Sequence, residues 1–249
     1  RLSYATLGAF TKYPRKSILD KKSDHIKDKK YGFFHSQNTF FDEVANELGM
    51  VDSNGEYMRH PLAYLVEAAD DICYTLIDFE DGINLGWISE EYALEFLIRL
   101  VKDSIDTKKY NSLKHKTDRV AYLRALSVNT LINDTVKIFL ANEEKILNGQ
   151  FTKTILSESV FKAQMKDIID ISVRKVYNSK EVIEKELKGY QVIHKLLSVF
   201  IKASVNNQSD NTTALDDLVL SSLPQAYIHK DGNLYDQLLD ISCFVASLT

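Results

Sequence analysis

The chain has few residues that break helices or crosslink a fold. Its 249 residues include three prolines, nine glycines and two cysteines. So few cysteines exclude a disulfide-rich scaffold. We expect Cys73 and Cys243 to be buried free thiols, while a disulfide between them stays conceivable. A net charge of −4 argues against a general nucleic-acid binder.

Long apolar runs are also missing. No run approaches the roughly 18 residues that cross a bilayer, and no signal peptide opens the chain. We therefore expect a cytoplasmic protein without a membrane partner. The chain begins at Arg1 without a methionine and ends at Thr249 without a helix cap. Both ends look cut, so we expect a piece of a longer protein.

Strand-like alternation of apolar and polar residues does not occur, and apolar residues recur instead at helical spacing. The sequence therefore predicts an all-α fold, a multi-helix bundle. The predicted helices cover residues 2–12, 38–48, 61–81, 89–104, 118–148, 160–177, 179–205, 215–223 and 235–249.

The most informative of these helices follows Arg59-His60-Pro61. At about 100° per residue, one sector roughly 100° wide collects most of its polar side chains. These are Glu67, Asp70, Asp71, Tyr74, Asp78 and Asp81. The apolar side chains predicted to pack lie elsewhere on the helix: Leu62, Leu65, Ala69, Ile72 and Leu76. Five carboxylates this close repel one another, so a metal ion, a basic segment or solvent should face them.

Asp70, Tyr74 and Asp78 stack along this helix over about 12 Å. A metal at one end with a sugar-sized ligand alongside would suit that span, but so would a solvated helix face. Asp71 is an alternative metal ligand, and Glu67 is a candidate anchor for a basic side chain. One aspartate cannot hold a divalent metal, and the histidines offer no clear partner, so the chain alone does not complete a metal site.

A lysine-rich segment, residues 12–30, holds eight Lys or Arg against three Asp, a local charge of about +5. Such a segment can face a triphosphate or can simply be a solvated loop. His60 is expected to cap or pack at the start of the following helix.

Three stretches resemble one protein family. They are Tyr-Ala-Thr-Leu-Gly-Ala-Phe-Thr-Lys-Tyr-Pro-Arg at 4–15, Lys-Lys-Tyr-Gly-Phe-Phe at 29–34, and Arg-His-Pro-Leu-Ala-Tyr-Leu-Val-Glu-Ala-Ala-Asp-Asp-Ile-Cys-Tyr at 59–74. They are similar to the C-terminal part of bacterial deoxyguanosine triphosphate triphosphohydrolases, members of the HD-domain phosphohydrolases. The resemblance is strong over residues 2–85, reduces to helical pattern between about 90 and 230, and returns faintly at 239–249.

The resemblance implies roles for six residues. The family holds a divalent metal with an H…HD…D set, and Asp70 matches the last Asp. The other ligands and the catalytic His/Glu element belong upstream of Arg1, so no catalytic residue is assigned in this chain. Lys12, Tyr13 and Lys30 would hold the triphosphate. Tyr74 would lie against the deoxyribose, and Asp78 would bond its 3′-hydroxyl. The metal would be magnesium, manganese or an iron-group ion.

The implied reaction is metal-dependent hydrolysis of dGTP, or of other dNTPs, to the deoxynucleoside and inorganic triphosphate. The resemblance also implies a homo-oligomer. Residues 1–249 would form one helical unit, with 1–85 in the HD catalytic core and 86–249 in a C-terminal helical region. A non-catalytic nucleotide-binding or oligomerisation module is the alternative. Weak binding of single-stranded nucleic acid through residues 12–30 is a third reading.

Overall fold

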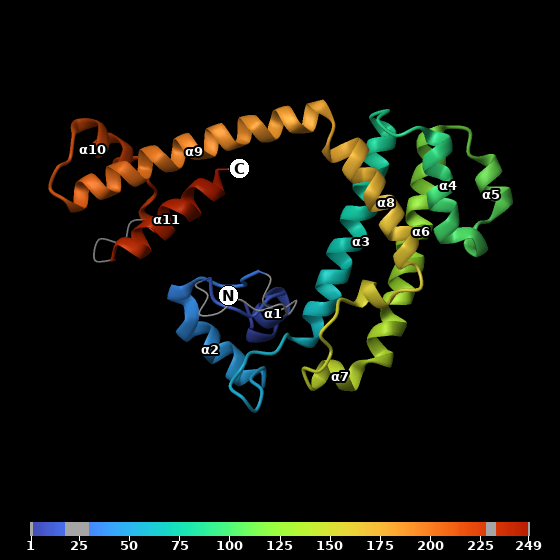
Figure 1. Cartoon of the computed structure of the whole chain (residues 1–249), viewed down its shortest axis with the longest axis horizontal. Coiled ribbons are helices and arrows are strands. Elements are labelled where there is room, and N and C mark those ends of the chain that lie inside the picture. The colour runs from blue at the N-terminus through green and yellow to red at the C-terminus, as the bar shows by residue number, and fades with distance from the viewer. Residues whose placement is uncertain (1, 18–29, 228–232, 249) are drawn as a thin grey trace. The chain divides into compact units, whose positions relative to one another are not determined.

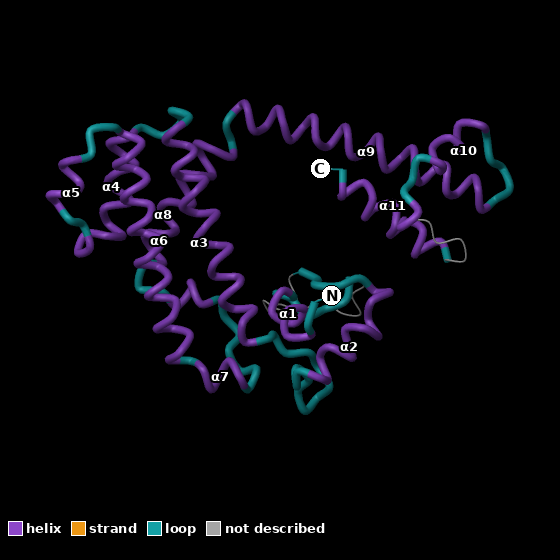
Figure 2. Tube along the Cα trace, turned by 180° about the vertical axis from the view of Figure 1, so that it is seen from behind, coloured by secondary structure: helices purple, strands orange, loops and turns teal. Residues whose placement is uncertain are grey.

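The computed structural model describes residues 2–17, 30–227 and 233–248, and it confirms the predicted all-α class. Within those ranges the chain forms helices and loops with no β-strand, only two isolated bridges (Figure 2). The α-helices are α1 (Tyr4–Phe10), α2 (Asn38–Glu47), α3 (Pro61–Asn84), α4 (Glu90–Val101), α5 (Thr107–Ser112), α6 (Lys116–Ala141), α7 (Glu143–Leu147), α8 (Lys162–Ser172), α9 (Lys180–Gln208), α10 (Ala214–Ser221) and α11 (Leu234–Ser247).

The chain divides into two compact units, Arg1–Ser179 and Lys180–Thr249. All six residues singled out by the resemblance fall in the first unit. The proposed assignment of 1–85 to a catalytic core and 86–249 to a further helical region stays a prediction.

The first unit is built around α3, α4, α6 and α8 (Figure 1). Helices α3 and α4 contact each other, and each of them also contacts α6 and α8. Their shared core contains Ile72, Leu76, Phe79, Ile83, Leu97, Leu123 and Ile168, each at most 2% exposed. Helix α1 contacts both α2 and α3. This core fixes one side of α3, and α1 packs against the same helix.

Local sequence explains where α3 begins. The His60 side chain accepts a hydrogen bond from the Leu62 amide at 3.2 Å, and Pro61 occupies the first turn. The predicted capping role of His60 is thus confirmed. The helix continues to Asn84, and Gly86 follows with a positive φ of 78°.

The buried face of α3 is rotated from the predicted one. Leu62 and Ala69 were expected to pack, yet both are exposed, while Tyr64 and Ala68 are buried in their place. The rotation is possible because Glu67, expected on the polar stripe, is buried against an arginine. The prediction of buried thiols was also wrong: both cysteines are free, but Cys73 is exposed and Cys243 half-buried.

Two predicted helices are divided in the structure, and short elements are present that the sequence did not predict. The expected helix over 118–148 is broken at Asn142 into α6 and α7. The expected helix over 160–177 is α8 followed by a π-helical turn, η5 (Val173–Tyr177). The structure adds α5 and a 3₁₀ turn, η4 (Ile155–Glu158), because short elements carry too little periodicity to be recognised.

The second unit packs α10 and α11 against α9. Its core holds Phe200, Leu223, Ile241, Phe244 and Val245. A capping box between Thr213 and Asp216 begins α10.

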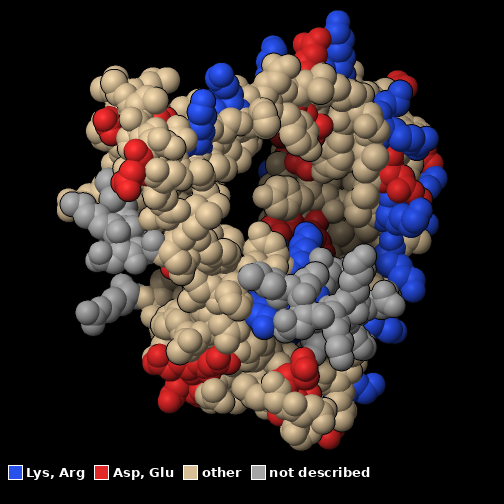
Figure 3. Space-filling view, turned by 60° about the vertical axis from the view of Figure 1, so that its left-hand side comes forward, with Lys and Arg blue, Asp and Glu red and all other residues tan. Residues whose placement is uncertain are grey.

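On the face drawn in Figure 3, Lys and Arg side chains occur beside Asp and Glu side chains over the described part of the surface. No helix within the described ranges is long and apolar enough to cross a membrane.

Candidate functional site

A cavity of 590 Å³ lies where α1, its following turn and α3 meet. Lys12 and Asp70 face each other there, with the Lys12 Nζ 2.5 Å from the Asp70 Oδ2. Both side chains remain accessible, at 28% and 41% exposure. A cation and a carboxylate 58 positions apart in the sequence therefore meet at an open cavity.

At Gly32, the chain after the lysine-rich segment packs against the turn that follows α1. A Cβ at Gly32 would lie 2.3 Å from the Tyr13 carbonyl oxygen and 2.5 Å from the Thr11 methyl carbon. The Gly32 amide donates to the Arg15 carbonyl at 3.0 Å. Only glycine permits this approach of two backbones, so it fixes one wall of the cavity.

A buried ion pair contacts Tyr13, one of the residues that line the cavity. The Arg59 guanidinium donates to Glu67 at 2.8 Å, and both side chains are at most 6% exposed. Arg59 also lies over the Tyr64 ring at 4.2 Å, and Glu67 accepts the Tyr13 hydroxyl at 3.1 Å. Glu67 thus anchors a basic side chain, as the sequence suggested, and also holds Tyr13.

Lys30 completes the group at this end of α3. Its Nζ lies 5.7 Å from the centre of the Tyr13 ring. Burial, followed by the Glu67 carboxylate, raises the pKa of Tyr13 to about 12, so its hydroxyl stays neutral at ordinary pH. The structure therefore brings Lys12, Tyr13, Lys30 and Asp70 together.

Tyr74 and Asp78 lie farther along the same helix. The Tyr74 side chain is 64% exposed, and Asp78 accepts a hydrogen bond from the hydroxyl of Tyr177 in η5. Burial and then this bond raise the pKa of Tyr177 to about 12. Asp78 is therefore already oriented by a partner from a distant part of the chain.

The described residues do not make a metal site by themselves. They contain no group of three or more His, Cys, Asp or Glu placed to share an ion. Asp70 offers one carboxylate, and it is paired with Lys12. The alternative ligand, Asp71, lies on a different cavity beside Tyr74, and burial followed by the Glu67 charge raises its pKa. A metal here would need further ligands.

Sequence reasoning assigned no role to Arg59 or Tyr177. Arg59 stands at the start of the quoted motif, and the carboxylate of Glu67 eight residues later was the available signal. Tyr177 had none, because its contact with Asp78 spans 99 positions and depends on how η5 packs on α3.

Fold and site together define an α-helical protein with an open cavity that combines Lys12, Tyr13 and the helix-borne Asp70. No family model matches the chain. It is, however, 30% identical over 256 residues to a "deoxyguanosinetriphosphate triphosphohydrolase-like protein" of Synechocystis sp., with all of this chain and 57% of the relative covered. A protein of the same name from Listeria monocytogenes is 29% identical over 272 residues, again with all of the chain and 57% of the relative covered.

A "deoxyguanosinetriphosphate triphosphohydrolase" of Serratia proteamaculans is 29% identical over 218 residues, covering 80% of this chain and 42% of the relative. The resemblance inferred from the sequence is thus confirmed along the whole chain. The chain spans little more than half the length of the first two relatives, 57% in each case.

Proposed function

We propose that this chain is part of a metal-dependent deoxynucleoside triphosphate triphosphohydrolase, with dGTP as the first substrate to test. The reaction would release the deoxynucleoside and intact inorganic triphosphate. The observation that carries the proposal is the meeting of Lys12, Tyr13 and Asp70 at one cavity, with Lys30 beside the Tyr13 ring. The names of the similar proteins support the same reaction class.

The chemistry of these groups fits a triphosphate. A triphosphate carries several negative charges, and the ammonium groups of lysines can neutralise them as compact positive charges. A neutral tyrosine hydroxyl can donate to a phosphate oxygen without adding negative charge. The same lysines would stabilise charge that develops on the leaving triphosphate.

Asp70 is proposed as one metal ligand, with magnesium, manganese or an iron-group ion as the candidates. The further ligands would come from polypeptide outside this chain, since the described residues do not complete a set. Tyr74 and Asp78, one and two further turns along α3, are proposed to contact the sugar and its 3′-hydroxyl.

Product analysis tests the reaction. The longer polypeptide that contains this chain is incubated with dGTP and each candidate metal, and the products are separated by anion-exchange chromatography. We expect deoxyguanosine and triphosphate. Release of dGMP and pyrophosphate, or of dGDP and phosphate, would exclude this reaction class.

Two variants connect the result to the site. Asp70→Asn should lower turnover at least a hundredfold, a loss comparable to removing a catalytic electrostatic group. Asp81→Asn, an exposed carboxylate three turns farther along α3, serves as the matched control and should retain turnover. Equal activity of both variants would remove Asp70 from the proposal.

A further inference from the structure

Helix α9 extends well beyond the core of the second unit. Helices α10 and α11 lie along its C-terminal half (Figure 1), where Phe200 and Ala203 are buried. Over residues 180–195, about four turns, the described chain buries no side chain of this helix. Packing of an apolar face stabilises most helices of proteins, so we expect a stretch of this length to have a partner.

One face of this exposed stretch is apolar. Ile183, Leu187 and Tyr190 are 41%, 59% and 76% exposed, and they follow one another at intervals of four and three residues. The same spacing continues through His194 to Leu197, which packs against the core of the second unit. Alternating intervals of three and four residues are typical of the seam between two paired helices. Ile183, Leu187 and Tyr190 form the α9 stripe.

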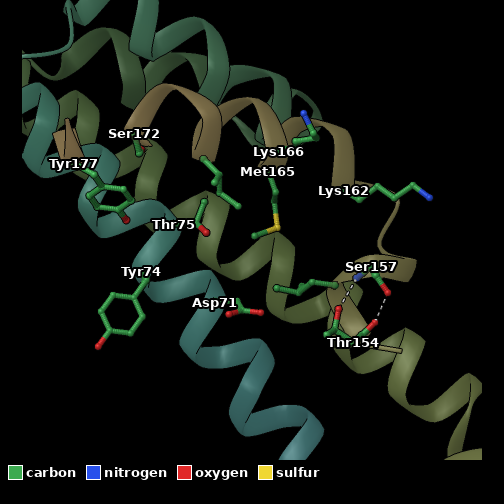
Figure 4. A pocket seen from close by; sticks show the side chains of 12 residues that line it. Asp71, Tyr74, Thr75, Thr154, Ser157, Lys162, Met165, Lys166, Ser172 and Tyr177 are labelled. Carbon is green, nitrogen blue, oxygen red and sulfur yellow. Dashed lines mark hydrogen bonds between the residues drawn. The ribbon is translucent and has the colours of Figure 1, made fainter. Parts of the chain in front are cut away.

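The α9 stripe lies outside the candidate site. The cavity drawn in Figure 4 is lined by residues of α3, α8 and η5 and by residues in and next to η4. The cavity beside Lys12 is lined by residues of α1, α3 and the loops that follow α1. Among the described residues that line these two cavities, none belongs to α9. The stripe is therefore a surface for another helix and not a wall of that site.

The charges of α9 favour a second copy of the same helix as the partner. Residues 181–186 hold three glutamates against one lysine, a net charge of −2. Residues 187–208 hold three lysines and no aspartate or glutamate. In a parallel pair the two acidic ends would meet and repel each other. In an antiparallel pair each acidic end lies along the basic part of the other helix, where the charges are complementary.

The positions of two of these charges fit an antiparallel pair. Glu184 and Lys195 are 11 residues apart, close to three full turns, so both side chains project from the same flank of the α9 stripe. When Leu187 of one copy lies opposite Tyr190 of the other, Glu184 of each copy comes beside Lys195 of the other. Two-fold symmetry forms this contact twice.

We propose that the α9 stripe is a self-association surface, on which α9 of a second copy of this chain packs in the antiparallel orientation. The two copies bury the stripe between them and form ion pairs between Glu184 and Lys195 along its flank. This inference goes beyond the proposed function, because it concerns how copies of the chain assemble and involves no contact with substrate.

Sedimentation velocity of the 249-residue chain over a roughly hundredfold range of concentration tests the surface. The wild type should form a reversible dimer. Leu187→Glu places a charge in the seam and should raise the dissociation constant of the dimer at least about tenfold. Val192→Glu is the matched control, because Val192 is 57% exposed on the opposite side of α9, and it should leave the constant unchanged. Circular dichroism checks that both variants keep their helix content.

Exchange of two charges tests the orientation. Glu184→Lys alone should weaken the dimer roughly three- to tenfold, because two-fold symmetry places two like-charge contacts in the pair. The double variant Glu184→Lys with Lys195→Glu restores opposite charges across an antiparallel pair, so its dissociation constant should return to that of the wild type.

Three results would overturn the proposal. They are a chain that stays monomeric over the whole range, equal effects of Leu187→Glu and Val192→Glu, and no recovery in the double variant. In the first case, a Leu187→Cys thiol that resists alkylation in the longer polypeptide, but not in this chain, would identify polypeptide outside this chain as the occupant of the stripe.

Discussion

At the scale of single residues, the buried Arg59–Glu67 pair controls how the loop that carries Lys12 meets α3. The pair also contacts Tyr13, so one buried carboxylate links the helix to the turn beside the cavity. Removing either partner leaves a buried charge without compensation, which costs far more than the pair itself contributes.

We predict that Glu67→Ala lowers the free energy of unfolding by about 3–5 kcal/mol, because Arg59 is left unpaired in the interior. Urea unfolding followed by circular dichroism measures it. The matched control is Glu95→Ala, which removes an exposed ion pair with Arg99 on α4 and should cost less than about 1 kcal/mol. Equal losses would mean that the buried pair has no special role.

Tyr177 gives a pH-dependent prediction. Its pKa rises from 10.0 to about 12 in the folded chain, so folding favours the neutral hydroxyl. Its contribution to the free energy of unfolding is therefore full below pH 10 and decreases as the pH rises towards 12. We expect the wild type to be more stable than Tyr177→Phe at pH 9, and this difference to shrink by pH 12.

Unfolding curves of both proteins between pH 8 and pH 12 check this expectation. Tyr190→Phe, at a position 76% exposed, is the control and should track the wild type throughout. A constant difference between wild type and Tyr177→Phe would show that the Asp78 bond does not depend on the neutral hydroxyl.

At the scale of elements, two glycines with opposite surroundings make a paired prediction. A Cβ at Gly32 would meet backbone at 2.3 Å, whereas a Cβ at Gly189 in α9 would meet nothing within 4 Å. Gly189→Ala should therefore stabilise the chain by about 0.5–1 kcal/mol through helix propensity alone. Gly32→Ala should displace the wall beside Tyr13 and weaken triphosphate binding at least tenfold.

Thermal unfolding measures the first effect and calorimetric titration with triphosphate the second. If Gly32→Ala binds triphosphate normally, the close approach of these two backbones is not required by the cavity.

At the scale of the whole molecule, every residue of both cavities lies before Ser179, where the first compact unit ends. Helix α9 begins at the next residue, so a cut there interrupts no helix. We predict that a chain of residues 1–179 folds and retains the triphosphate and deoxyguanosine affinities of the full chain within about twofold, a difference below about 0.5 kcal/mol.

Circular dichroism, unfolding and titration of this shorter chain make the measurement. A matched chain of residues 180–249 should bind neither probe. Loss of both affinities on removing the second unit would place part of the site there.

The sequence by itself determined the fold class and most helices. Apolar spacing, Pro61 after a capping His60, and positive-φ glycines such as Gly49 and Gly149 are local signals, and local signals set where helices begin and end. The quoted motifs also determined which proteins this chain resembles. The sequence did not predict the break at Asn142 or the short helix α5, because local sequence preferences there are weaker than the tertiary contacts that fix these features.

Tertiary structure alone decided which residues meet. Lys12 pairs with Asp70 across 58 positions, and Tyr177 reaches Asp78 across 99, distances over which periodicity carries no information. Tertiary structure also decided which side of α3 is buried. Glu67 can be buried because Arg59 pairs with it, and Leu62 is exposed instead. The unpartnered Ser172 hydroxyl follows from the packing of α8 on α3, since hydrogen-bond satisfaction is a property of the folded environment and not of the residue type.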